Sequence, residues 1–425
     1  MELVVPVLGA VFFVYFLALG FGALTRRIGL PSLVGEILAG IVIANAAFGA
    51  FDLQTWLGLS TSTSQGTINR DALGALSDIG VVFLAFAVGL EVLPTAVRKI
   101  ARSAASIAIL GTTIPFLLGF LLLVALDGTG AWATALFVGI ALMVTSLTVT
   151  ARFLRERNLL NTDEAHLLLG SALFEDVIGT AALTVALAIT AEQLHEPGDL
   201  VYQIGVVVGG AVAFVLFLIY AAPRLVRRYA PAHGPNAPPN PPEHRTTVFV
   251  IAILFCLGAS TLASSFELAS IIGALLAGMA MSELRERYDL REGFGALNTF
   301  FVPFFFASIG LLVSVNELAA VWPLATALIV LAVAGKLAPV PIERRRHGRE
   351  VAWRVSAGLV PRAEVAIIVA LTAFGAGLIT GDIYAAIVVM AIATAVIGPV
   401  LLHYLYPRTP AAAPEAAAEP EATGV

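Results

Sequence analysis

Two acids stand side by side in the stretch SALFEDVIGT, residues 171–180, within a long apolar segment. An ionisable group inside a membrane span costs about 2.5–3.5 kcal/mol on insertion scales, so each one requires a physical reason. Glu175 and Asp176 lie about twelve residues from one end of the segment, which is about 18 Å along a helix. Two carboxylates this close in a low-dielectric medium do not ionise together easily, so one tends to keep a proton. A site that exchanges a proton for a cation needs this property; the alternative is a hydrogen-bonded pair with a structural role.

Lys336, in the stretch LAVAGKLAPV, is the natural counter-charge for these acids. Neighbouring helix residues point about 100° apart, so one carboxylate can face a water-filled cavity while the other meets Lys336. The lysine lies about eight residues before a basic run, at a depth of about 12 Å, and its long stem can reach in either direction. Pairing with an acid and extension to the membrane surface therefore both stay open.

Arg362 and Glu364 follow Pro361 inside another apolar segment. Proline removes a helix hydrogen bond and clashes with the preceding turn, so the helix is expected to break here. Nearby charges can compensate the backbone groups that the break exposes. Residues i and i+2 do not face each other on an intact helix, but they can on a broken one. The alternative to a role in transport is a helix-end ion pair.

Hydroxyl oxygens gather in the stretch MVTSLTVTAR, residues 143–152. Hard cations such as sodium prefer oxygen ligands, so Thr145 and Ser146 are candidate ligands. Serine and threonine also join helices in membranes by hydrogen bonds, and we assign that role to Thr148 and Thr150.

The composition requires an apolar solvent for most of the chain. Of 425 residues, 59% are hydrophobic and only 12% are charged, whereas a soluble domain carries about 25% charged residues. The mean hydropathy of +0.93 agrees. The apolar excess makes a lipid bilayer the expected partner. The net charge of −5 is modest, and nothing in the sequence resembles a basic nucleic-acid-binding surface, so no nucleic acid is expected as partner. The single cysteine, Cys256, excludes a disulfide within the chain.

Apolar runs of about 20 residues, the length that spans a bilayer, recur along the whole chain. We expect an all-α polytopic membrane protein with about thirteen spans, near residues 3–24, 32–50, 72–92, 103–126, 131–154, 163–191, 201–222, 246–264, 267–283, 296–315, 318–338, 351–378 and 382–406. The run at 267–283 is short and is expected to be tilted or partly interfacial.

Basic residues predict the orientation of these spans. With the N-terminus outside, 21 of the 24 Lys and Arg fall in inner segments and Arg70 alone falls outside. Lys336 and Arg362 lie within spans. Because loops rich in Lys and Arg face the cytoplasm, we expect a cell-membrane protein with an outer N-terminus and a cytoplasmic C-terminus. The first run lacks a basic segment before it, so we expect a retained span and no signal peptide.

Two hydrophilic stretches separate or follow the spans. Residues 230–244 read as a Pro-rich inner linker, and the Pro/Ala/Glu-rich residues 407–425 as a disordered tail. A linker after the seventh span suggests two six-span halves that face opposite ways, the inverted-repeat plan of many transporters. The polar stretch 143–152 and the broken stretch 356–368 hold corresponding places in the two halves. Interrupted helices in such places predict the binding site.

At these residues the chain resembles a known family, the monovalent cation:proton antiporter-2 family. The resemblance covers about residues 1–406, because several stretches look like the family's blocks in the right order. They include LPSLVGEILAGIVI, LSDIGVVFLAFAVGLEVLP, TSLTVTARFLRERNLLNTDEAHLLLGSALFEDVIG, ELASIIGALLAGMAMSE, FFVPFFFASIGLLV and GLVPRAEVAIIVA.

The resemblance implies a dimeric exchanger with a scaffold, a mobile core and two unwound, crossing helices. The implied segments are scaffold helices at 1–100 and 246–316, core helices at 101–195 and 317–406, a linking helix with the inner linker at 196–245, and the tail at 407–425. No nucleotide-binding regulatory domain is expected in the chain, which argues against a nucleotide- or glutathione-gated potassium efflux system.

The resemblance also implies roles for the site residues. Asp176 matches the family's cation- and proton-binding aspartate, and Lys336 matches the lysine that pairs with the preceding position in electrogenic members. That position is usually Asp in electrogenic members, Asn in electroneutral ones and Gln in glutathione-gated ones. Here it is Glu175, and a carboxylate together with Lys336 favours the electrogenic pattern.

The sequence therefore predicts a secondary active transporter, and no enzyme, that exchanges a monovalent cation, sodium first, for protons by alternating access. Asp176 would bind the transported cation or a proton, with Glu175, Thr145 and Ser146 near it, and no resident cofactor is expected. Lys336, Arg362 and Glu364 would compensate charge. Two alternatives stay open: a potassium/proton antiporter and, more distantly, a sodium-coupled solute symporter.

Overall fold

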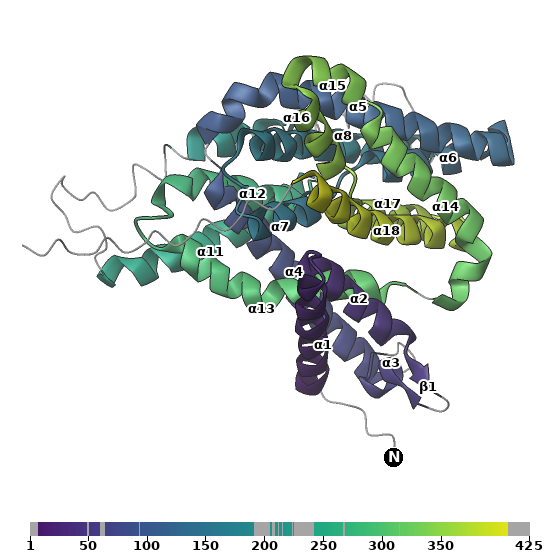
Figure 1. The fold of residues 1–425 in the computed structure, drawn as a ribbon, viewed down its shortest axis with the longest axis horizontal. Coiled ribbons are helices and arrows are strands. Elements are labelled where there is room, and N and C mark those ends of the chain that lie inside the picture. Colours follow the sequence, from purple (N-terminus) through teal and green to yellow (C-terminus); the bar gives the residue numbers. More distant parts are fainter. Residues whose placement is uncertain are drawn as a thin grey trace, which may run out of the picture.

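The computed structural model of the chain is built almost wholly from helices (Figure 1). It describes residues 7–48, 51–59, 64–92, 94–190, 205, 209–210, 212–214, 216–222, 224, 242–266, 268–313 and 315–406. Within these residues, nine helices are long and apolar enough to cross a membrane, and three shorter apolar helices, at Ser32–Asn45, Ser270–Leu284 and Glu364–Gly375, accompany them. An all-α polytopic membrane fold is thus confirmed. The count of thirteen stays a prediction, because most of the seventh expected span, 201–222, lies outside the described residues.

Six helices form one packed group. They are α1 (Val7–Arg27), α2 (Ser32–Asn45), α4 (Ser64–Glu91), α11 (Pro242–Ser265), α12 (Ser270–Met281) and α13 (Leu290–Leu311). α1, α2 and α13 lie in the lower part of Figure 1, and α11 and α12 lie at its left. α13 packs on both α4 and α2, and α4 packs on α12. Glycine permits the close approach of α2 and α13, because a Cβ on Gly40 would collide with the carbonyl of Ala307.

The second expected span ends earlier than its apolar pattern predicts. α2 ends at Asn45, not at residue 50, and Asn45 Nδ2 donates to Ile41 O at 2.8 Å and to Val313 O at 2.7 Å. A two-stranded hairpin follows, with β1 (Ala47–Phe48) antiparallel to β2 (Phe51–Asp52), and then the short helix α3 (Leu53–Trp56). The apolar residues Ala47 and Phe48 therefore belong to a strand and do not lengthen the span.

A second group of helices fills the upper half of Figure 1. It comprises α5 (Pro94–Asp127), α6 (Trp132–Met143), α8 (Asp163–Thr190), α14 (Val315–Leu337), α17 (Glu364–Gly375) and α18 (Gly381–Leu405). α5 packs on α6, α8 and α14, while α18 packs on α14 and α17. Short elements complete the described residues. η1 (Thr129–Ala131) and α15 (Val340–His347) lie between helices of this group, η3 (Ser282–Leu284) follows α12, and η2 (Phe217–Ala221) lies within the seventh expected span. The division into scaffold and mobile core stays a prediction, since it concerns motion.

Two helices of the second group are interrupted, as the sequence predicts. After α6 the chain is extended at Val144, and α7 (Leu147–Glu156) begins behind Ser146, whose hydroxyl caps it. α16 (Arg349–Gly358) likewise ends before a non-helical segment, and α17 begins at Glu364. The second break holds Pro361, which lacks a backbone donor and disfavours helix geometry in the residue before it. Each break exposes backbone groups in the interior of the fold.

Candidate ion-binding site

The two interrupted helices meet and hydrogen-bond to each other at their breaks. The backbone N–H of Ser146 donates to Pro361 O at 2.8 Å, and the Thr145 hydroxyl donates to Leu359 O at 2.9 Å. Thr145 and Ser146 are each 1% exposed. Backbone groups freed by one break are therefore satisfied by the other, which a buried polar segment requires.

Arg362 binds the carbonyl ends of both interrupted helices. Its side chain is fully buried, and Nε donates to Leu142 O of α6 at 2.9 Å. Nη1 donates to Leu359 O at 2.9 Å and to Val360 O at 2.8 Å, just after α16. A cation at a helix C-terminus neutralises the partial negative charge of the free carbonyls. Arg362 thus compensates the breaks themselves, and its backbone N–H is held by the Thr394 hydroxyl of α18 at 3.1 Å.

Glu364 does not pair with Arg362. The described residues contain no ion pair between the two, so the structure does not support the alternative of a helix-end ion pair. Glu364 instead accepts hydrogen bonds from the Ser146 hydroxyl at 2.9 Å and the Thr148 hydroxyl at 3.0 Å. It is the first residue of α17, where the helix dipole favours a negative charge. Glu364 therefore fixes the hydroxyls of the opposite break.

Glu175 and Lys336 form a fully buried ion pair. Glu175 Oε2 lies 2.7 Å from Lys336 Nζ, and neither side chain has any exposed area. Lys336 also donates to Met143 O, the last residue of α6, at 3.2 Å. The lysine is thus turned inward and does not extend to the membrane surface. Gly111 of α5 leaves room for the pair, because a Cβ there would lie 2.6 Å from Glu175 Oε1.

Asp176 is the acid of the pair that remains without a counter-ion contact. It is 4% exposed, and its buried Oδ1 has no hydrogen-bond partner among the described residues. Its negative charge is repelled by Glu364 and Glu175 and attracted by Lys336. Burying a carboxylate without a partner is costly unless it takes up a proton or a cation. The arrangement is therefore suited to binding one or the other.

Helix α8, which carries both acids, lies directly against the first break. Gly179 shares a helix face with Asp176, three residues earlier, and a Cβ on Gly179 would lie 2.6 Å from Val144 Cγ2. The predicted ligands Thr145 and Ser146 belong to this break, but their hydroxyl protons go to Leu359 O and Glu364. Their oxygen lone pairs stay available, so cation ligation by these residues remains a prediction.

Three further residues of the site could not be identified from the sequence. Gly111, Gly179 and Thr394 have no charge and no motif, and only their neighbours in space show their roles. Thr150, assigned to helix joining, donates its hydroxyl to Gly358 O at 2.6 Å, across the crossing. Among the described residues, no group of three or more His, Cys, Asp or Glu could hold a metal ion.

Comparison with known proteins places this geometry in a family. The family profile "Sodium/hydrogen exchanger, transmembrane" matches residues 12–405, nearly the whole chain. The chain belongs to this family. It is a family of membrane transporters described as sodium/hydrogen exchangers.

Relatives of similar length support the assignment. The chain is 26% identical over 419 residues to the high-affinity Na⁺/H⁺ antiporter NhaS3 of Synechocystis sp., covering 92% of this chain and 88% of the relative. It is 27% identical over 394 residues to the Na⁺/H⁺-K⁺ antiporter GerN of Bacillus cereus, covering 91% and 92%. The fold is similar to that of the sodium/proton antiporter MjNhaP1 from Methanocaldococcus jannaschii, with a TM-score of 0.64, 14% identity and coverage of 94% and 96%.

Proposed function

We propose that this exchanger moves sodium ions against protons by letting the two compete for the carboxylate of Asp176. One observation carries the proposal: Asp176 is nearly fully buried beside two crossing, interrupted helices, and its Oδ1 has no hydrogen-bond partner among the described residues. Thr145, Ser146 and carbonyls of the breaks would supply further oxygen ligands to sodium.

Charge neutralisation explains why the two ligands exchange. With sodium or a proton bound, Asp176 carries no net charge, and the helices that hold it can move past the first helix group. With neither bound, a bare carboxylate would cross an apolar barrier at high cost. The empty site therefore stays on one side, and transport of one ligand requires return of the other.

Replacement of the carboxylate tests this proposal. Purified Asp176→Asn protein in proteoliposomes should lose sodium-driven proton movement, measured by dequenching of a pH dye. Asp382→Asn makes the same chemical change at an exposed position at the start of α18 and should keep the wild-type rate. Cation-driven proton movement in Asp176→Asn at the wild-type rate would show that Asp176 does not carry the ion.

Potassium is the second candidate cation. GerN, a relative of similar length, is named for both sodium and potassium. The same dye assay with sodium, lithium and potassium in turn ranks the cations. We expect sodium to give the largest response at equal concentration, and a larger potassium response would reassign the substrate.

Orientation, location and assembly complete the proposal. The basic residues favour a cell-membrane protein with the N-terminus outside, by the positive-inside rule.

The apolar face of α1, where Leu8 is 82% exposed and Phe12 and Phe16 are each 60% exposed, can pack against lipid or a second copy. The family resemblance favours a homodimer. Light scattering of the detergent-solubilised protein would give its mass directly.

A further inference from the structure

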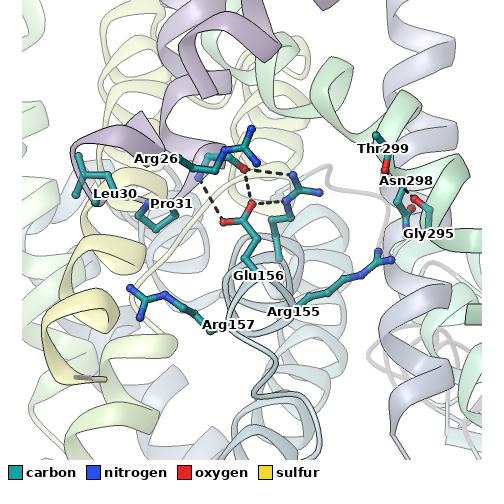
Figure 2. Close-up of a pocket in the computed structure, with 12 residues that line it drawn as sticks. Arg26, Leu30, Pro31, Arg155, Glu156, Arg157, Gly295, Asn298 and Thr299 are labelled. Carbon is teal, nitrogen blue, oxygen red and sulfur yellow. Dashed lines mark hydrogen bonds and ion pairs between the residues drawn. The ribbon is translucent and has the colours of Figure 1, made fainter. Parts of the chain in front are cut away.

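A cavity of about 430 Å³ lies at the arginine-rich ends of α1, α7 and α13 (Figure 2). Arg26, Arg152, Arg155 and Arg157 line it, with Glu156 as the one carboxylate in the lining. None of the ion-site residues lines this cavity, so its chemistry is separate from sodium binding. A cavity with such a lining is suited to an anion and not to a cation.

The carboxylate in the lining is already neutralised. Glu156 pairs with Arg152 at 2.9 Å and accepts hydrogen bonds from the hydroxyl and the backbone N–H of Ser32. Arg152 also pairs with the buried Glu36 at 3.3 Å. Arg152 is thus shared by two carboxylates, and four lining arginines against these two acids leave the cavity with an excess of positive charge.

Arg155 and Asn298 line this cavity, and both hold buried polar groups without partners in the described part of the chain. Arg155 Nη1 is buried and has no hydrogen-bond partner among the described residues, and neither has Nδ2 or Oδ1 of Asn298, which is 2% exposed. Figure 2 shows the Arg155 side chain extended toward Asn298 and Gly295. Leaving such groups unsatisfied is costly, so buried donors of this kind usually have a partner.

Glu91 is the acid whose charge favours the charged form of Arg155, but it forms its ion pairs with two other arginines. It lies 3.2 Å from Arg285 and 2.9 Å from Arg291. Among the described residues, Arg155 forms no ion pair of its own, although it lines the cavity. Its guanidinium thus lacks a carboxylate partner among these residues.

We propose that this cavity binds a phosphate group, held by Arg155 and Asn298 with Arg26 and Arg157 nearby. A guanidinium presents paired N–H donors that match two phosphate oxygens, and the Asn298 amide adds a further donor. The phosphate can belong to a free anion or to the headgroup of an anionic lipid, since both present the same oxygens.

The position of the site predicts a consequence for transport, which rests on the proposed function. Arg26 and Asn298 belong to α1 and α13 of the first helix group, whereas Arg155 belongs to the interrupted helix α7 and Arg157 is the residue that follows its end. A phosphate between them joins the two groups and holds them in this arrangement. Occupancy therefore slows exchange.

Thermal unfolding of the full chain in a neutral detergent measures binding without any transport. The probes are inorganic pyrophosphate as a choline salt, against choline chloride of equal ionic strength, and short-chain phosphatidylglycerol against phosphatidylcholine. A ligand that binds only the folded protein raises its unfolding temperature in a concentration-dependent manner. Arg155→Gln and Asn298→Ala should each weaken the apparent affinity by about tenfold or more. Arg345→Gln removes the same charge from an exposed position of α15 and should leave the affinity unchanged.

The shifts in unfolding temperature either support or overturn phosphate binding in this cavity. A shift with pyrophosphate that the two site variants weaken identifies a free anion, and a shift with phosphatidylglycerol alone identifies a lipid. No shift with either probe, or equal affinities in wild type, Arg155→Gln and Arg345→Gln, overturns the proposal. If Arg155→Gln does not fold, Asn298→Ala and Arg26→Gln take its place. Because unfolding does not depend on exchange, a failure of the transport mechanism leaves this result intact.

Discussion

At the scale of single residues, the Glu175–Lys336 ion pair fits against α5 because residue 111 is a glycine and has no Cβ. Glu175 is one methylene longer than the aspartate that the family resemblance leads one to expect, so its carboxylate reaches farther toward α5. Gly111 stands at that point, and a Cβ there would lie 2.6 Å from Glu175 Oε1 and 3.4 Å from Lys336 Nζ. The longer acid is thus accommodated by a residue without a side chain.

We predict that Gly111→Ala displaces this ion pair. Overpacking of a filled interior costs about 1–3 kcal/mol, so the unfolding temperature should fall and exchange should weaken. Gly74→Ala is the matched control, because a Cβ there meets nothing within 4 Å and alanine favours a helix. An unfolding temperature for Gly111→Ala equal to that of Gly74→Ala would mean that the ion pair tolerates a methyl group at position 111.

The pair should also show strong coupling when its members are removed one at a time. Breaking a buried ion pair leaves an uncompensated charge and costs about 3–5 kcal/mol, whereas removing both partners costs much less. We therefore expect Glu175→Gln and Lys336→Met each to lower the unfolding temperature, and the double variant to recover most of the loss. Additive effects of the two substitutions would contradict a direct interaction.

The sequence could predict Asp176, Glu175 and Lys336, because ionisable residues in apolar segments stand out by type alone. It could not choose between pairing and surface extension for Lys336, since that choice depends on how α14 packs against α8. Gly111 and Gly179 gave no signal, because a glycine that makes room for a neighbour looks like any other glycine until the neighbour is known.

At the scale of elements, one guanidinium contacts both interrupted helices at their crossing. Arg362 donates to Leu142 O at the end of α6 and to Leu359 O and Val360 O after α16, so it joins both interrupted helices. The sequence predicted the breaks, because Pro361 and the polar run 143–152 are local signals. It left an ion pair between Arg362 and Glu364 open as an alternative, because the contacts of Arg362 with Leu142 O and of Glu364 with Ser146 join residues more than 200 positions apart.

We predict that Arg362→Lys impairs exchange although it keeps the charge. A lysine ammonium cannot reproduce the planar fork that bridges carbonyls of two elements, and each lost charged hydrogen bond weakens the crossing. The exchange rate should fall by about tenfold or more, measured with the pH dye in proteoliposomes. Arg349→Lys, at an exposed position where α16 begins, is the matched control. Wild-type exchange by Arg362→Lys would assign Arg362 a purely electrostatic role.

At the scale of the whole molecule, a polar cluster joins the two helix groups near the arginine-rich end. Ser32 and Glu36 of α2 bind Arg152 and Glu156 of α7, with Arg152 lying 3.3 Å from Glu36. If α7 moves against α2 during transport, this cluster must open in each cycle. Within the first group, by contrast, the Ser77 and Ser308 hydroxyls lie 2.9 Å apart on α4 and α13.

Cross-linking these two places tests which parts of the molecule move. In a Cys256→Ala background, we predict that a short thiol cross-linker between Ser32→Cys and Glu156→Cys blocks exchange reversibly. The same reagent between Ser77→Cys and Ser308→Cys should leave exchange intact, because both residues belong to one packed group. Exchange that survives the first cross-link would place the moving boundary elsewhere in the fold.

The buried pair also decides how the whole exchanger responds to membrane potential. If cation binding at Asp176 opens the Glu175–Lys336 pair and releases a further proton, each cycle moves net charge, and about 2.3 kcal/mol per charge per 100 mV then acts on it. We predict that a potential negative on the side to which protons move accelerates wild-type exchange, measured under a potassium/valinomycin clamp. Lys336→Gln should exchange without this dependence, while Arg345→Gln should keep it. A wild-type rate that does not change with the clamped potential would make exchange electroneutral and leave the pair a structural role alone.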